Sequence, residues 1–282
     1  MDKKIADGTN TLFYREEGSG LPVVLLHGFA EDGAIWSNQS DYLRSGFRLI
    51  IPDLPGTGDS IPTSYSSASS PTPTSQSSAA NISMESMAEN VLTILNHEGI
   101  DKCVLIGHSM GGYATLAFAE KYPDRLKGFG LFHSTAYPDS EEKKSARRKS
   151  IDFIRNNGSA PFIRQSTPNL FAAGTRTSRP DLIQSTIDRY SGFAPKALIA
   201  WYEAMIRRPD RTAVLRDAAT PVLFVIGKDD QAVLPEQTLQ QSHLPSLTHI
   251  HILQRSAHMG MLEEPDKSNG LLQSFLNFVI HT

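Results

Sequence analysis

The chain has 282 residues, of which 39% are hydrophobic and 20% are charged. This composition is typical of a globular protein with a sizeable core, and α/β folds of this length often form one unit. The formal net charge of -3 gives no sign of a nucleic-acid or anionic-membrane partner. The single cysteine, Cys103, excludes an internal disulfide and fits a reducing compartment.

Targeting segments are not indicated by the sequence. Residues 1–4 are not followed by an apolar stretch, so we expect no secretory signal, and no apolar run approaches the length of a membrane span. We therefore expect a cytoplasmic protein without a membrane partner. No pattern in the chain indicates an oligomeric state.

Short, unbroken apolar runs recur along the chain and are bounded by turn residues. Such runs are typical of strands that are buried on both faces of a sheet. The predicted strands cover residues 23–26, 49–51, 103–106, 128–132, 222–226 and 250–253.

Helical patterns lie between these runs. In one of them Met87, Val91 and Leu95 fall on one face, and Ser83 precedes it as an N-cap. The alternation of strands and helices predicts an α/β fold with a doubly wound, mostly parallel sheet. The predicted helices cover residues 32–44, 83–97, 113–121, 235–243 and 266–280.

Two segments interrupt this alternation. Residues 60–81 are dominated by Ser, Thr, Pro and Ala and cannot bury enough apolar surface to fold alone, so we predict a long loop within the core domain. Residues 134–215 contain several helical patterns and no buried strand run. We predict that they form a helical cap, inserted between the two parts of an α/β core at residues 1–133 and 216–282.

The most informative motif is Gly107-His108-Ser109-Met110-Gly111-Gly112, which lies between a predicted strand and a predicted helix. A Gly-x-Ser-x-Gly in this position is the signature of a nucleophile elbow, a sharp turn that exposes a serine hydroxyl. Residues close to such a serine must be small, which the glycines satisfy.

A serine hydroxyl becomes a good nucleophile when a histidine accepts its proton and a carboxylate orients that histidine. Asp229 and Asp230 follow one late predicted strand, and His258 follows the next. Both loops leave the carboxyl end of a strand, where the active sites of open α/β sheets lie.

With these motifs the chain resembles the α/β-hydrolase superfamily, close to its small esterase-like branch. The resemblance runs from about Leu12 to the C-terminus and is weakest in the predicted cap. It is carried by four motifs in order: residues 27–29 (His-Gly-Phe), residues 53–60, the elbow, and the late Asp and His loops.

The resemblance implies a role for each residue that matches a family motif. Ser109 would be the nucleophile and His258 the general base. The family pattern Gly-x-x-Asp-x-x-Val fits Asp230 as the acid better than Asp229. The backbone N–H groups of Phe29 and Met110 would form the oxyanion hole. The implied activity is hydrolysis of a small or medium, mainly apolar carboxylic ester through an acyl-enzyme, with no metal or organic cofactor.

Other functions of the same fold stay open. A carbon–carbon hydrolase or lyase can use the same three side chains, although the menaquinone-pathway lyase usually has a basic residue where this chain has Tyr113. A ligand receptor of this fold can keep most of the triad. Haloalkane dehalogenases and epoxide hydrolases of this fold have an aspartate at the nucleophile position, so Ser109 argues against both activities.

The sequence leaves two readings for several residues near the site. His133 ends a strand and is either a pocket residue or a core histidine. Trp201 and Met205, with other apolar cap residues, either line an acyl pocket or form the core of the cap. We expect the basic run at residues 143–149 to be a solvated helix face, and we expect the alternating His249 and His251 not to form a metal site.

Overall fold

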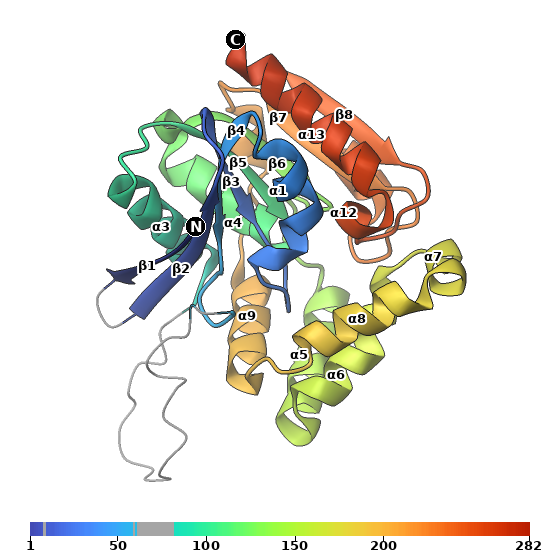
Figure 1. Ribbon diagram of the computed structural model, residues 1–282. Helices are drawn as coiled ribbons and strands as arrows, with labels where there is room; N and C mark the ends of the chain where they lie inside the picture. Colours follow the sequence, from blue (N-terminus) through green and yellow to red (C-terminus); the bar gives the residue numbers. More distant parts are fainter. Residues whose placement is uncertain (8–9, 59, 61–81) are drawn as a thin grey trace.

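The computed structural model describes residues 1–7, 10–58, 60 and 82–282. Within them an eight-stranded sheet forms the centre of the molecule, in the order β1-β2-β4-β3-β5-β6-β7-β8 (Figure 1). The strands are β1 (Asp2–Asp7), β2 (Asn10–Glu17), β3 (Leu21–Leu26), β4 (Phe47–Pro52), β5 (Cys103–His108), β6 (Leu126–Phe132), β7 (Val222–Gly227) and β8 (Thr248–Leu253). The segment 60–81, which we predict as a loop, lies outside the described residues except for Ser60.

The strands from β4 to β8 in the sheet are parallel to one another, as the sequence predicts. Every residue of β5 and of β7 is buried, because helices cover both faces of the sheet at these strands. All six predicted strands are present, and their carboxyl ends therefore lie along one edge of the sheet.

The two strands β1 and β2 are missing from the sequence prediction. They form an antiparallel pair at the edge of the sheet, and β2 pairs antiparallel with β4. In β1 Ile5 is buried, and in β2 the three consecutive residues Leu12, Phe13 and Tyr14 are buried, whereas Arg15 is not. The apolar run of β2 is only three residues long and is followed by charged residues, and β1 is mostly polar, so neither stands out in the sequence as a buried strand.

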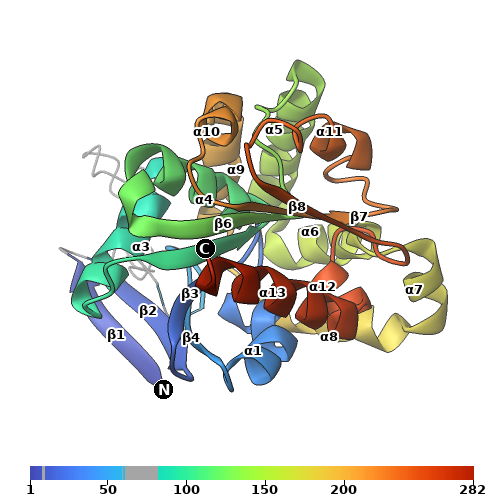
Figure 2. The ribbon, with the colours of Figure 1, turned by 90° about the horizontal axis from the view of Figure 1, so that it is seen from above.

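Helices pack on the two faces of the sheet (Figure 2). One layer contains α3 and α4, which contact each other, and the other contains α1 and α13. The core helices are α1 (Ser37–Leu43), α3 (Met84–His97), α4 (Met110–Lys121), α10 (Thr212–Arg216), α11 (Pro235–Leu239), α12 (Gly260–Glu263) and α13 (Pro265–Ile280), with 3-10 helices η1 (Gly33–Trp36) and η2 (Pro123–Arg125). No helix among the described residues is long and apolar enough to cross a lipid bilayer.

The segment 134–215, all of it described, contains helices and no strand. It lies between β6 and β7 and projects from one edge of the sheet (Figure 1). We call it the cap. Its helices are α5 (Glu141–Asn157), α6 (Ser159–Ser166), η3 (Thr167–Leu170), α7 (Ala173–Ser178), α8 (Pro180–Tyr190) and α9 (Pro195–Arg207), and α10 begins within it.

Several bonds fix the cap to the core. The indole N–H of Trp201 donates to the carbonyl oxygen of Pro55 at 2.9 Å. Arg189 forms an ion pair with Asp32 at 2.9 Å. The backbone N–H of His258 donates to the carbonyl oxygen of Leu170 at 2.9 Å, so the cap also contacts the late histidine loop.

Candidate active site

Ser109 occupies the turn between β5 and α4. Its backbone has φ 49° and ψ -113°, a conformation that few residues other than glycine adopt. A Cβ on Gly107 would lie 2.2 Å from the backbone of Gly111, and one on Gly111 would lie 2.6 Å from the carbonyl oxygen of His27. The turn is therefore as tight as the motif predicts, and Ser109 itself is half-buried.

Three side chains that are distant in sequence meet at this turn. The Ser109 Oγ lies 2.9 Å from Nε2 of His258, and Nδ1 of His258 lies 2.8 Å from Oδ2 of Asp230. Both distances lie within hydrogen-bond range. The arrangement permits His258 to accept the Ser109 proton on one ring nitrogen while its other nitrogen donates to the carboxylate.

Asp230 rather than Asp229 approaches His258. The second oxygen of Asp230, Oδ1, accepts hydrogen bonds from the backbone N–H groups of Ala232 at 2.8 Å and Val233 at 3.0 Å. The side chain of Asp230 is buried, whereas Asp229 is exposed. Burial alone would raise the pKa of Asp230, but the charge and hydrogen bond of His258, together with His133, outweigh it and hold that pKa below its ordinary value.

His133 lies behind the Asp230 carboxylate and not in the space above Ser109. Its Nδ1 is 3.5 Å from Oδ2 of Asp230, without hydrogen-bond geometry, and neither ring nitrogen has a hydrogen-bond partner among the described residues. Burial lowers the pKa of His133 to about 4, against a smaller opposite effect of Asp230. Its imidazole is therefore neutral at neutral pH.

Two backbone N–H groups beside Ser109 are free to bind a substrate oxygen. Phe29 follows β3 and Met110 is the first residue of α4. Within the described part of the chain, neither N–H donates to a protein acceptor. The neighbouring N–H of Gly28 is already used, because it donates to Oε2 of Glu31 at 2.7 Å. These are the two donors that the family resemblance assigns to the oxyanion hole, and their role stays a prediction.

A cavity of about 210 Å³ lies over Ser109 and His258. Met205 lines it, which is one of the two readings that the sequence leaves open. Trp201 does not line it, because its ring is fully buried between the cap and the core and packs edge-on against Phe29. His133 does not line it either. The described residues that line the cavity are Phe29, Glu31, Ser109, Tyr113, Lys143, Arg147, Leu170, Tyr202, Met205, Gln231, Ala232, Val233 and His258.

The charged side chains that line this cavity are not predicted from the sequence. We predicted a solvated helix face for the basic run, which is correct for the exposed Arg148 but wrong for Lys143 and Arg147. Lys143 and Arg147 are four residues apart and share one face of α5. The spacing alone does not identify this pair in the sequence, because Lys144 and Arg148 are also four residues apart. A mainly apolar pocket is therefore a correct description of only part of this cavity.

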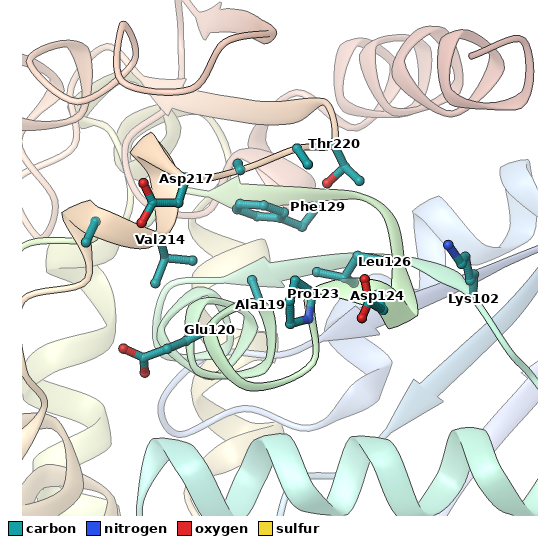
Figure 3. A pocket seen from close by; sticks show the side chains of 13 residues that line it. Lys102, Ala119, Glu120, Pro123, Asp124, Leu126, Phe129, Val214, Asp217 and Thr220 are labelled. Atoms are coloured by element: carbon teal, nitrogen blue, oxygen red, sulfur yellow. The ribbon is translucent and has the colours of Figure 1, made fainter.

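A larger cavity, about 410 Å³, lies at the opposite edge of the sheet (Figure 3). Its lining includes Lys102, Leu126 and Thr220, which precede or begin β5, β6 and β7. These are amino ends of strands, whereas Ser109, Asp230 and His258 follow carboxyl ends. The larger cavity is therefore remote from the three side chains, and we place the candidate site in the smaller one.

A second buried imidazole–carboxylate pair adjoins the site. Nδ1 of His108 lies 3.0 Å from Oε2 of Glu31, and its Nε2 lies 3.0 Å from the carbonyl oxygen of His258. No motif in the sequence indicates that Glu31 and His108 form a pair. The described residues contain no cluster of His, Cys, Asp or Glu that could hold a metal ion.

Comparison with known proteins places this geometry in a family. A family model described as alpha/beta hydrolase fold matches residues 22–144. The structure of a thermophilic esterase from Thermogutta terrifontis, with malate bound, is 30% identical with a TM-score of 0.87, and the match covers 99% of both chains. This chain belongs to the alpha/beta hydrolase family.

Curated relatives of this alpha/beta hydrolase differ in their named substrates. The pimeloyl-[acyl-carrier protein] methyl ester esterase of Nitrosospira multiformis is 25% identical, and the match covers 92% of this chain and 96% of that protein. A 2-hydroxy-6-oxononadienedioate/2-hydroxy-6-oxononatrienedioate hydrolase of Burkholderia vietnamiensis is 24% identical, with 96% and 93% covered. The prediction of an enzyme of the hydrolase class is confirmed, as is the predicted fold.

Proposed function

We propose that this alpha/beta hydrolase is a serine hydrolase that cleaves a small carboxylic ester through an acyl-enzyme. The observation that carries the proposal is the pair of contacts at His258, 2.9 Å to the Ser109 hydroxyl and 2.8 Å to the Asp230 carboxylate. Nucleophile, base and orienting acid are then in hydrogen-bond reach before any substrate binds.

The geometry supports a two-step reaction. Ser109 Oγ attacks the ester carbonyl while its proton passes to Nε2 of His258, and Asp230 stabilises the imidazolium that forms. The N–H groups of Phe29 and Met110 donate to the developing oxyanion, and the loss of one such donor typically lowers kcat by about a hundredfold to a thousandfold. The alcohol leaves with the proton from His258, and water then releases the acid by the same route.

The cavity supports a substrate of limited size. Its volume of about 210 Å³ is below the roughly 300–1,000 Å³ of most ligand pockets. Phe29, Leu170 and Met205 provide an apolar wall for a short acyl or alcohol chain.

The test compares wild type with Ser109→Ala on short-chain p-nitrophenyl esters, together with labelling by a fluorophosphonate. We expect multiple turnover and labelling at Ser109 in wild type, and neither in the variant, which should keep its folded circular-dichroism spectrum. Full activity in Ser109→Ala would contradict the nucleophile assignment, and saturable binding without turnover would favour a receptor.

Carbon–carbon bond hydrolysis is the second candidate. It is favoured by several relatives with names such as 2-hydroxy-6-oxo-2,4-heptadienoate hydrolase, whose matches cover 94–96% of this chain. The same Ser109, Asp230 and His258 would serve that reaction. Release of a carboxylic acid from a vinylogous diketone, at a rate above that for simple esters, would support it.

A further inference from the structure

Two cations of the cap helix α5 reach the cavity that contains Ser109. Lys143 and Arg147 both line it, although most of α5 is exposed to solvent. A long cationic side chain normally places its charge in bulk water. Their position inside a small cavity therefore needs an anionic counterpart.

The protein provides only part of that counterpart. Asp139, whose side chain is fully buried, accepts from Nε of Arg147 at 2.6 Å and forms an ion pair with Arg208 at 3.0 Å. One carboxylate therefore forms ion pairs with two guanidinium groups. Lys143 donates to the carbonyl oxygen of Ala232 at 2.7 Å, and no carboxylate among the described residues lies within ion-pair distance of its ammonium group.

The carboxylate that lines the cavity, Glu31, is already neutralised. Glu31 accepts from the N–H of Gly28 and faces His108 at 3.0 Å. Since burial costs a charged group several kcal/mol unless it is paired, Glu31 is held by its own partner and is not a counterion for α5. An excess of positive charge remains at the α5 side of the cavity.

Tyr113 adds a neutral donor to the same side. Its ring packs against the guanidinium of Arg208, with 3.9 Å from the guanidinium carbon to the ring centroid, and its side chain lines the cavity. Burial would raise the pKa of Tyr113, but the charges of Arg208, Lys143 and Arg147 outweigh it and lower that pKa. The environment of this hydroxyl therefore favours negative charge.

We propose that Lys143, Arg147 and Tyr113 form a carboxylate-binding subsite, so that the preferred substrate is an ester that carries a second, ionised carboxylate group. This inference rests on the proposed ester hydrolysis at Ser109. Ammonium, guanidinium and phenol groups are all donors that bind carboxylates by short, charge-assisted hydrogen bonds. The short distance from subsite to nucleophile within one small cavity fits a half-ester of a short dicarboxylic acid or an acylated hydroxy acid.

The test uses two matched pairs of esters. Monomethyl succinate against dimethyl succinate places the charge on the acyl side, and O-acetylglycolate against its methyl ester places it on the alcohol side. Wild type should favour the anionic member of one pair in kcat/KM, and the pair that shows the preference identifies the side that the subsite holds.

Variants separate recognition from structure. Lys143→Met and Tyr113→Phe should lower kcat/KM for the favoured anionic ester by about tenfold to a hundredfold, the usual effect of a lost charge-assisted bond, and should lower it more for that ester than for its neutral partner. The matched control is Lys144→Met, because Lys144 is adjacent on α5 but pairs with Glu141. Equal losses on both esters in Lys143→Met, or a wild-type preference for the neutral ester in both pairs, would overturn the subsite.

A binding measurement keeps this inference separate from the proposed function. Ser109→Ala should bind monomethyl succinate or O-acetylglycolate in calorimetry, and the added Lys143→Met should weaken that binding by about tenfold or more. Absence of any effect of Lys143→Met on binding would overturn the subsite. If binding depends on Lys143 but the wild type neither hydrolyses esters nor reacts with fluorophosphonate, the subsite is supported and ester hydrolysis is contradicted.

Discussion

The carboxylate of Glu31 and the ring of His108 form a buried pair, with 3.0 Å between Oε2 and Nδ1. The other ring nitrogen of His108 faces a second acceptor, the carbonyl oxygen of His258, at 3.0 Å. Since neither acceptor can donate, both ring nitrogens are satisfied only when both carry protons. The geometry therefore favours an imidazolium at His108, held between a carboxylate and the backbone of the proposed general base.

Glu31→Gln should destabilise the protein strongly. The variant leaves the His108 charge buried without its counterion, and breaking a buried pair in this way typically costs about 3–5 kcal/mol. Urea denaturation should measure that loss in the free energy of unfolding. The matched control is Glu89→Gln, because Glu89 pairs with Lys121 at the surface, where both side chains are exposed, and should contribute far less to stability than a buried pair. Similar losses in the two variants would contradict a buried charged pair.

The same pair predicts a pH dependence of stability. Burial opposes both charges, but the partners outweigh it, so the pKa of Glu31 is lowered from 4.5 and that of His108 is raised from 6.5. The contribution of Glu31 is present above its unfolded pKa and is lost as pH falls through the lowered value. The contribution of His108 is complete below 6.5 and is lost as pH rises through the raised value.

The free energy of unfolding of wild type, minus that of Glu31→Gln, should therefore be largest between about pH 4.5 and 6.5 and should decrease at higher pH. Denaturation series at several pH values measure this difference. A difference that does not change up to pH 10 would show that His108 is not charged in the folded protein.

His133 should produce the opposite trend on the acid side. Its folded pKa of about 4 lies below the ordinary 6.5, so the unfolded chain binds its proton first as pH falls. Wild type should lose about 3 kcal/mol of stability from this residue between pH 6.5 and 4. His133→Leu should lose less over that interval, as seen in thermal denaturation at each pH. An identical acid slope in the two proteins would be the contrary result.

Asp230→Asn should reduce ester turnover far more than Asp229→Asn. Asparagine at 230 can no longer stabilise an imidazolium at His258, and equivalent changes in serine triads lower kcat by about a thousandfold or more. The exposed Asp229 carboxylate makes no contact with His258 in the described structure, so its variant should stay within about twofold of wild type. Steady-state kcat for one p-nitrophenyl ester decides between them, and comparable losses would contradict the choice of acid.

The parallel core could be predicted from the sequence because buried strands leave unbroken apolar runs, such as residues 222–226. The convergence of Ser109, Asp230 and His258 could be predicted because each follows such a run and the carboxyl ends share one edge. β1 and β2 could not, since β1 is mostly polar and the apolar run of β2 is short and followed by charged residues. The short α7, α10 and α12, of six, five and four residues, are too brief to show helical periodicity.

Within the site, the limits of prediction lie in contacts between distant segments. Glu31 and His108 are 77 positions apart, and neither stands in a pattern that names the other. Trp201 and Met205 share the spacing of one helix face, yet Trp201 packs against the core and Met205 lines the cavity. Periodicity shows which face of a helix is buried but not which element it is buried against.

Hydrogen bonds hold the backbone of Ser109 in place. Its N–H donates to the carbonyl oxygen of Phe132 at 2.9 Å, its carbonyl oxygen accepts from the hydroxyl of Ser134 at 2.7 Å, and its φ of 49° lies outside the common regions. A residue anchored in this way cannot shift to follow a differently shaped substrate. Diversification of specificity on this scaffold must then occur in the surrounding helices and loops. An engineer who wants a new substrate should redesign the inner face of α5 and leave the elbow untouched.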